Sequence, residues 1–212
     1  MMPPIDDKPR LLAMAESSAA AETLALAFLH DPLWQFIYPN ERQRQQMLAV
    51  FFRAVVHLAI RQQRAFGVGS PLAGVAVWEI AGQKPASSLL DFVPFLRLVF
   101  SSFALAGWRV RRVFTGFEQM RQAYAPAAHY YLQNIGVRPT AQGQGLASQL
   151  IRPFLAEADA RGLASYTETV TPENVSLYEH YGFRVVEQCR LPGLPLTLWG
   201  FYREEKISPS TE

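Results

Sequence analysis

The chain has 212 residues, the length of one domain, and 50% of them are hydrophobic, which excludes a disordered chain. Its 20 basic and 18 acidic residues leave a net charge of +2, so the chain lacks the concentrated positive charge of a nucleic-acid-binding protein. The single cysteine, Cys189, excludes an intramolecular disulfide and a cysteine-based zinc site, and it fits a reducing compartment. We expect one domain over residues 1–212, located in the cytoplasm and holding no metal.

Hydrophobic periodicity, caps and turn residues predict an alternation of helices and strands along the whole chain. In chain order, we expect a strand at 10–14, a helix at 19–29, a helix at 41–64, strands at 65–68 and 73–80, a helical stretch at 85–122, a strand at 128–137, a helix at 146–161, a strand at 163–170, a short helix after Thr171, and strands at 183–191 and 196–203.

Caps mark the two N-terminal helices. Ser17 or Ser18 is placed to cap the first of them and Asn40 the second. Between the two helices, two prolines are expected to interrupt both helix and strand, although the segment holds large aromatic residues such as Trp34 and Tyr38. Such a loop either packs under the fold or lines a pocket, and both interpretations stay open.

A mainly apolar block at about 85–127 is expected to be a helical insert in the domain. Within it, residues 92–108 form an apolar run of seventeen residues, the short limit of a membrane span. Pro94 and Arg97 interrupt the run, which favours a buried helix and argues against stable membrane insertion. A surface for membrane docking or for a dimer remains an alternative, so the chain is expected to be a monomer or a homodimer.

A glycine-rich turn, Gln142-Gly143-Gln144-Gly145, comes directly before the helix at 146–161. Such a turn at a helix N-terminus presents unpaired backbone N–H groups and the positive end of the helix dipole, which suits a pyrophosphate. The turn lacks the Gly-Lys-Ser/Thr of a P-loop and the Gly-x-Gly-x-x-Gly of a dinucleotide fold. Taken alone, an ordinary tight turn explains it as well as a phosphate site does.

Thr171 is expected to cap a short helix, and that helix carries a polar and aromatic stripe. Asn174, Tyr178 and Tyr181 are spaced i, i+4 and i+7, which places them on one face, and Pro172 and Gly182 mark the ends of the helix. A stripe of this kind is usually packing, but here it follows a candidate phosphate turn by one strand.

Together the two motifs resemble those of the GNAT family, the GCN5-related N-acetyltransferases. Gln142-x-x-Gly145-x-Ala147 is similar to the acetyl-CoA motif of that family, and Asn174, Tyr178 and Gly182-Phe183 are similar to its Asn…Tyr…Gly-Phe helix. A narrower set resembles the puromycin N-acetyltransferase branch: His129-Tyr130-Tyr131-Leu132, Gly136-Val137-x-Pro139, Ala158-Asp159, Glu168-Thr169, Leu191-Pro192 and the early Asp31-Pro32.

The resemblance implies an α/β (α+β) fold with a mixed, mostly antiparallel twisted sheet flanked by helices. Two parallel strands, at 128–137 and 163–170, would splay apart and hold acetyl-CoA between them. The pantetheine arm would pair with the backbone of Asn134, Ile135, Gly136 and Val137. The pyrophosphate would lie on the amides of Gln142, Gly143, Gln144, Gly145, Leu146, Ala147 and Ser148, and Asn174 and Tyr181 would complete the cofactor site.

The resemblance also implies direct attack of a primary amine on the thioester, with no covalent enzyme intermediate. Tyr178 is the expected acid that protonates the departing thiolate, and the oxyanion is expected to take a backbone N–H near Val137. Glu168 is the expected base, with Glu79 and His129 as rivals. Trp34, Tyr38, Glu79 and His129 are the candidate residues for acceptor binding.

The favoured function is therefore an acetyl-CoA-dependent N-acetyltransferase for a small-molecule or peptide amine. A non-catalytic acyl-CoA-binding sensor or interaction module with the same fold is the alternative. Neither interpretation requires a nucleic acid.

Overall fold

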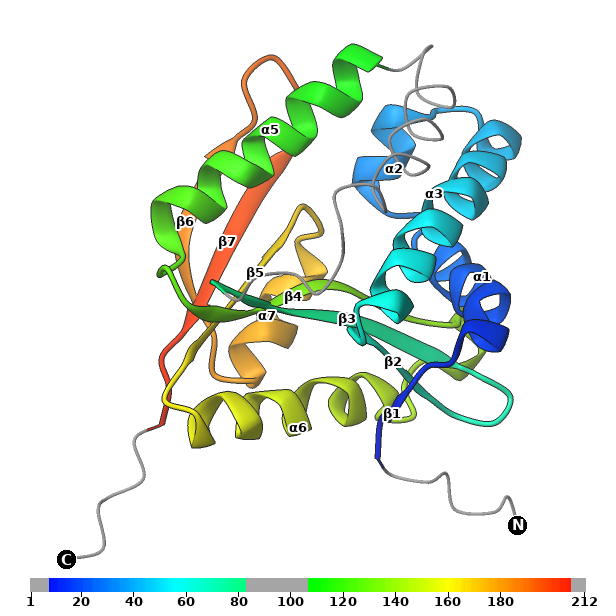
Figure 1. Ribbon diagram of the computed structural model, residues 1–212. Helices are drawn as coiled ribbons and strands as arrows, with labels where there is room; N and C mark the ends of the chain where they lie inside the picture. The colour runs from blue at the N-terminus through cyan, green and yellow to red at the C-terminus, as the bar shows by residue number, and fades with distance from the viewer. Residues whose placement is uncertain (1–7, 83–106, 207–212) are drawn as a thin grey trace, which may run out of the picture.

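A seven-stranded sheet with the order β1-β2-β3-β4-β5-β7-β6 organises the computed structural model, which describes residues 8–82 and 107–206 (Figure 1). Every neighbouring pair is antiparallel except β4 and β5, which are parallel. The strands are β1 (Arg10–Leu11), β2 (Ala65–Val68), β3 (Gly74–Ala81), β4 (His129–Val137), β5 (Ala164–Thr169), β6 (Arg184–Arg190) and β7 (Thr197–Arg203). The expected mixed, mostly antiparallel sheet is confirmed.

Helices cover both faces of this sheet. They are α1 (Ser17–Ala27), α2 (Pro32–Ile37), α3 (Glu41–Arg61), α5 (Gly107–Tyr124), α6 (Leu146–Ala160) and α7 (Glu173–His180), with short 3-10 turns at Met14–Glu16 and Pro139–Ala141. On one face, α1 and α3 pack over β2 and β3, and α5 packs over β7; on the other face lie α6 and α7 (Figure 1). Successive side chains of β3 point to opposite faces of the sheet and so pack against both helix layers. Val75 and Val77 pack toward α1 and α3, while Ala76 and Trp78 pack toward α6.

The expected cap of α3 is confirmed, and a buried arginine fixes the segment before it. The Asn40 side chain accepts a hydrogen bond from the backbone N–H of Gln43 at 3.0 Å. One turn later, Arg44 is only 4% exposed and donates to the carbonyl oxygens of Leu29 and Tyr38 at 2.7 and 2.8 Å. These bonds satisfy loop carbonyls that would otherwise be buried without partners.

The segment with two prolines forms a helix, so the expected interruption is wrong. Asp31 caps α2 by accepting a hydrogen bond from the N–H of Leu33 at 2.9 Å, and Pro32 occupies the first turn, where its missing N–H costs nothing. The prolines therefore start and follow the helix instead of breaking it.

Two other expected caps and one expected strand are corrected. Ser17 is already the first residue of α1, which has Glu16 at its N-cap position and no side-chain cap. Thr171 does not cap α7, because its hydroxyl donates to the carboxylate of Asp31 at 2.9 Å. The first strand ends at Leu11, since the chain turns into a 3-10 helix at Met14.

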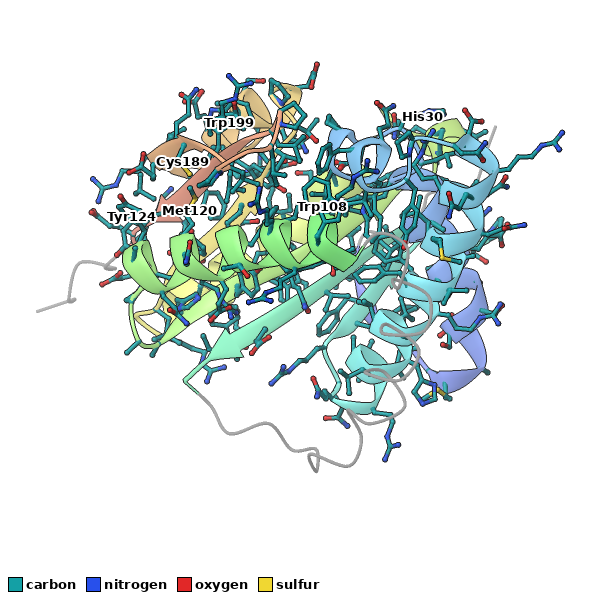
Figure 2. All side chains as sticks on the ribbon, turned by 90° about the horizontal axis from the view of Figure 1, so that it is seen from above. His30, Trp108, Met120, Tyr124, Cys189 and Trp199 are labelled. Atoms are coloured by element: carbon teal, nitrogen blue, oxygen red, sulfur yellow. The ribbon has the colours of Figure 1, made fainter. Side chains whose placement is uncertain are left out.

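Helix α5 is the described part of the expected insert, and residues 83–106 lie outside the described residues. It crosses β7 at Gly200, where an added Cβ would come within 2.7 Å of the Met120 sulfur. Viewed from above, α5 lies across the sheet with Trp108 near its beginning and Met120 and Tyr124 near its end (Figure 2). Among residues 8–82 and 107–206, no helix combines the length and apolar character that crossing a bilayer requires.

Candidate active site

The parallel pair β4 and β5 separates after three residue pairs. Their register runs from His129 beside Ala164 to Tyr131 beside Tyr166 and then ends. At the fork, the Thr167 hydroxyl donates to the carbonyl oxygen of Leu132 at 3.0 Å. Beyond this point each strand presents a free backbone edge to the other, so an extended ligand could pair with either.

A bulge in β4 lies at the same place. Val77 of β3 faces Asn134 and Trp78 faces Leu132, so Gln133 is an extra residue in the ladder. Bulges bend a strand and re-aim its side chains, and they are frequent beside active sites. This bulge bends β4 where it leaves β5.

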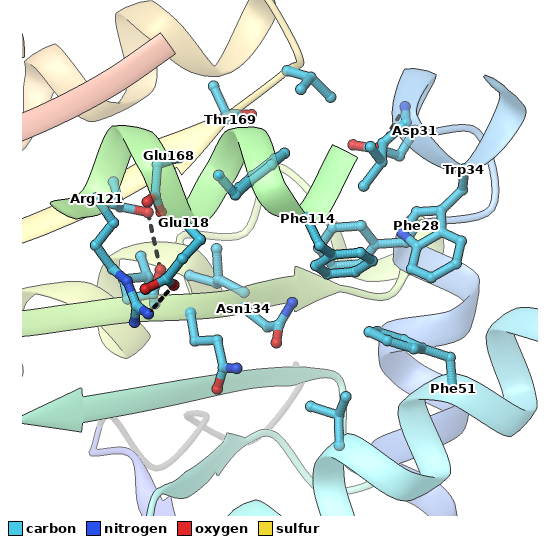
Figure 3. Close-up of a pocket in the computed structure, with 18 of the residues that line it drawn as sticks. Phe28, Asp31, Trp34, Phe51, Phe114, Glu118, Arg121, Asn134, Glu168 and Thr169 are labelled. Carbon is cyan, nitrogen blue, oxygen red and sulfur yellow. Dashed lines mark hydrogen bonds and ion pairs between the residues drawn. The ribbon is translucent and has the colours of Figure 1, made fainter. Parts of the chain in front are cut away.

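A cavity of about 750 Å³ opens above the fork, between β4, β5, α5 and the α1–α3 layer. It is within the range of small-molecule sites. Acidic and basic side chains from α5 and β5 lie toward one end, and aromatic side chains lie toward the other (Figure 3). Of the expected site residues, the lining includes Trp34, Asn134, Ile135, Glu168, Asn174 and Tyr178.

Glu168 is a half-buried residue whose carboxyl group has an altered proton affinity. Burial raises its pKa to about 8, and this rise is limited by a hydrogen bond with the Tyr131 phenol and by the positive charge of Arg121. Its Oε1 atom is buried without a hydrogen-bond partner among the described residues. A buried acceptor that is left unpaired is costly, so this oxygen is suited to receive a group from a substrate.

Two residues of α5 complete the charged end of the cavity. Arg121 forms an ion pair with Glu118, and its guanidinium lies 5.0 Å from the centre of the Tyr131 ring. Burial raises the pKa of Tyr131 well above its ordinary value, so its phenol stays protonated and can donate to Glu168. The negative charge of Glu118 raises the pKa of Glu168, in opposition to Arg121.

Tyr178 lies on the other side of the fork, on α7. It is 4% exposed and packs against the Phe183 and Phe201 rings, with centroids 5.9 and 5.1 Å away. Burial raises its pKa to about 12, and a hydrogen bond with Thr167 partly offsets that rise. The phenol is therefore protonated at neutral pH and available as a proton donor.

The glycine turn has the geometry of an anion site. Gly143 and Gly145 have φ of 76° and 78°, and an added Cβ on either would meet nothing within 4 Å. Gly145 caps α6, and the backbone N–H of Gln149 returns to its carbonyl oxygen at 3.2 Å. The amides at the start of the helix, before Gln149, have no acceptor within it, so they are available to a phosphate.

The remaining expected cofactor residues are distributed around the fork. Asn174 lines the cavity and donates to the Thr169 hydroxyl at 3.3 Å. Tyr181 is 8% exposed and belongs to the core under α6, outside the cavity lining. Gly136 packs against α1, where an added Cβ would lie 2.7 Å from the Cβ of Ala27.

Three of the four candidate acceptor residues lie outside the cavity lining. Tyr38 is 2% exposed within the α1–α3 core. Glu79 pairs with Arg64 at 3.4 Å on β3. Burial lowers the pKa of His129, whose Nδ1 lies 2.7 Å from the carbonyl oxygen of Pro126. Trp34 alone of the four lines the cavity.

Sequence reasoning did not assign a role to the cavity residues of α5 or to Tyr131. Val110, Phe114, Phe117 and Arg121 recur at helical spacing and line the cavity together. The spacing places these side chains on one face of a helix, but the sequence does not specify which part of the protein that face contacts. The position of Tyr131 in the cavity is explained by strand alternation. Its neighbour Tyr130 points to the other face of the sheet, where its hydroxyl donates to Glu157 at 2.7 Å.

Comparisons with known proteins agree with this geometry. Residues 105–185 match the family model described as an acetyltransferase (GNAT) domain. The chain is 29% identical over 175 residues to an uncharacterised N-acetyltransferase of Schizosaccharomyces pombe, covering 77% of this chain and 69% of that protein.

Solved acetyltransferases share the fold at low sequence identity. A putative arylalkylamine N-acetyltransferase 7 of the yellow fever mosquito Aedes aegypti aligns with a TM-score of 0.62 at 12% identity, covering 92% of this chain and 86% of the other. A polyamine N-acetyltransferase of Drosophila melanogaster aligns with a TM-score of 0.60 at 11% identity, covering 92% and 98%. The splayed strand pair, the glycine turn, the match over residues 105–185 and the relative together make the chain similar to the GNAT N-acetyltransferases.

Proposed function

We propose that the protein transfers the acetyl group of acetyl-CoA to the primary amine of a small molecule by direct attack. The observation that carries this proposal is that two groups line one cavity at the fork of β4 and β5: the Glu168 carboxylate, which has a buried, unpaired oxygen, and the protonated phenol of Tyr178. A base and an acid are the two groups that aminolysis of a thioester needs.

Acetyl-CoA fits the donor side in two places. Its pyrophosphate would accept hydrogen bonds from the free amides of the turn around Gly145, at the positive end of α6. Its pantetheine arm would lie along the free edge of β4 at Asn134 and Ile135, opposite Thr169 and Asn174. The thioester would then point into the cavity, toward Glu168.

The proton balance of the reaction follows from these positions. Ionised Glu168 takes a proton from the acceptor ammonium, and the freed nitrogen attacks the thioester carbonyl carbon. The oxyanion of the tetrahedral intermediate accepts a backbone N–H from the free edge of β4. When the carbon–sulfur bond breaks, the thiolate leaves with a proton from the Tyr178 phenol, and the second proton of the attacking nitrogen restores that phenol. Glu168 releases the proton that it took to bulk solvent.

The test is release of free CoA from acetyl-CoA in the presence of a panel of primary amines. Tyr178→Phe keeps the ring and removes the hydroxyl, so we expect turnover to fall about 10²-fold with little change in the KM for acetyl-CoA. Tyr202→Phe, on β7 outside the cavity lining, is the matched control and should keep full turnover.

Two results would contradict the proposal. Equal turnover in Tyr178→Phe and wild type would move the acid role to another group. Acetyl-CoA binding without CoA release for any amine would favour the alternative, an acyl-CoA-binding module.

A further inference from the structure

The two ends of the cavity have opposite chemistry. At one end lies an aromatic wall, formed by Phe28, Trp34, Phe51, Phe114 and Phe117. At the other end lies the charged cluster of Glu118, Arg121 and Glu168 (Figure 3). A ligand that spans the cavity therefore meets apolar rings at one end and carboxylates at the other.

Three rings of the aromatic wall, those of Trp34, Phe51 and Phe114, are in contact with one another in turn. The Trp34 and Phe51 rings have centroids 4.8 Å apart, and the Phe51 and Phe114 rings have centroids 6.3 Å apart. The wall joins helices α2, α3 and α5, which are distant in sequence. Phe114 is 42% exposed, so it presents a large apolar surface that the rest of the described protein does not cover.

The charges of the lining favour one positive group. The described lining holds three carboxylates, Asp31, Glu118 and Glu168, and two guanidinium groups, Arg111 and Arg121, which gives a net charge of −1 when all are ionised. Asp31 already accepts hydrogen bonds from the Leu33 N–H and the Thr171 hydroxyl. The unpaired Oε1 of Glu168 is therefore the acceptor best placed for an ammonium.

We propose that the acceptor is a monoamine whose primary amino group is joined by a short linker to an aromatic ring, the ring lying on the aromatic wall and the amino group at Glu168. This inference rests on the proposed function, because it names the acceptor of the same site. A diamine would place its second ammonium against the rings, where it loses hydration and where the nearby carboxylate of Asp31 already accepts hydrogen bonds from the Leu33 N–H and the Thr171 hydroxyl. A small hydroxylated amine would leave the wall in contact with water.

The experiment compares three amines: 2-phenylethylamine, ethanolamine and putrescine. We expect kcat/KM for 2-phenylethylamine to exceed that for either of the others by about 30-fold or more, which is the effect of burying one phenyl ring. Binding is measured separately, by calorimetric titration of each amine into protein saturated with CoA.

Two aromatic residues on the same helix provide the matched variants. Phe114→Ala should raise the KM for 2-phenylethylamine about 10-fold while the KM for acetyl-CoA stays unchanged. Phe114→Leu keeps apolar volume and should recover part of the loss. Trp108→Ala removes another exposed aromatic of α5, 55% exposed and outside the cavity lining, and should change neither KM (Figure 2).

The outcomes separate this inference from the proposed function. If putrescine or ethanolamine is acetylated as well as 2-phenylethylamine, or if Phe114→Ala leaves its KM unchanged, the inference is overturned and the acetyltransferase activity stands. If no amine releases CoA, the proposed reaction fails. Calorimetric binding of 2-phenylethylamine that Phe114→Ala weakens would then still support the aromatic occupant, and its absence would overturn it.

Discussion

Glu168 holds a proton at neutral pH that an ordinary glutamate would have lost. Burial at the fork raises its pKa to about 8, while Tyr131 and Arg121 prevent a larger rise. A base in this range is ionised in a useful fraction of molecules at neutral pH and is still strong enough to accept a proton from an ammonium. The surroundings of this one side chain thus set the pH at which the proposed reaction can run.

The pH profile tests that role. We expect wild-type kcat/KM to rise with pH and to level off above about pH 8, because the carboxylate must be ionised to act as a base. Glu168→Gln should lower kcat/KM about 10²-fold at pH 7, and the loss should shrink as the pH approaches the pKa of the free amine. The measurement is CoA release from pH 6 to pH 10.

Glu118→Gln is the matched control within the same cavity. The negative charge of Glu118 raises the pKa of Glu168, so its removal should move the rising limb to lower pH and retain activity. A Glu168→Gln profile that follows the wild-type profile would assign the base elsewhere. A loss of equal size at every pH would instead indicate that Glu168 only positions the amine.

At the scale of elements, the proposed donor side depends on the start of α6. The turn presents N–H groups because the positive φ of Gly145 places it at the N-cap without a side chain. Gly162 lies just past the other end of the same helix with a φ of 62° and equally open space. The two glycines therefore form a natural pair for comparison.

Gly145→Glu places a carboxylate where the pyrophosphate is proposed to bind, so we expect the KM for acetyl-CoA to rise about 10²-fold. Gly162→Glu adds the same charge and a similar backbone strain, of about 1 kcal/mol, away from the turn. It should leave the KM unchanged. Equal KM values in the two variants would remove the pyrophosphate from this turn.

At the scale of the whole molecule, one ion pair joins the end of strand β7 to the C-terminal end of helix α6. Arg203 of β7 is 5% exposed and donates to both carboxylate oxygens of Asp159 on α6, at 2.8 and 2.7 Å. The backbone N–H of Lys206 donates to the same carboxylate at 2.8 Å. The pair therefore fixes the C-terminal end of α6 to the end of β7.

Asp159→Asn leaves a buried guanidinium without its counter-charge, so we expect the free energy of unfolding to fall by about 3 kcal/mol at pH 7. The pKa of Asp159 is lowered by its hydrogen bonds with Arg203, so its contribution is present above the unfolded pKa of 3.8 and is lost as the pH falls through the folded value. Urea denaturation at pH 7 and pH 5 should therefore show similar differences from wild type. Glu204→Gln, which breaks the exposed pair with Arg184, should change stability by less than about 0.5 kcal/mol, and an equal effect of both variants would contradict this account.

The region from β4 to α7 was predictable because its signals are local. The glycine turn before α6, the alternation along β4 and the spacing of Asn174 and Tyr178 are each readable within one element. Helix α2 was missed because Asp31 and Pro32, which start it, were interpreted with the other proline as an interruption. The hydroxyl of Thr171 was assigned to the nearest helix, whereas its partner, Asp31, lies 140 positions away.

The sequence predicted cavity residues on β4, β5 and α7 and one acceptor residue, Trp34, but none on α5. Glu168 and Tyr178 belong to recognisable motifs and both line the cavity, but their proposed roles await the experiments above. Glu118, Arg121 and Phe114 reach the cavity only because α5 packs on β7 at Gly200, a contact between elements that are far apart in the chain. No local pattern specifies which side of such a helix faces the sheet.

The position of α5 has a consequence for how this protein could evolve. The proposed donor residues lie on β4, α6 and α7, whereas α5, the helix that packs on β7, supplies two of the five rings of the aromatic wall and three of the five charged groups of the lining. A lineage could therefore change the molecule it acetylates through substitutions in a single helix, while the machinery for acetyl-CoA is inherited intact. The same separation makes α5 a segment to exchange between relatives when a new acceptor is wanted.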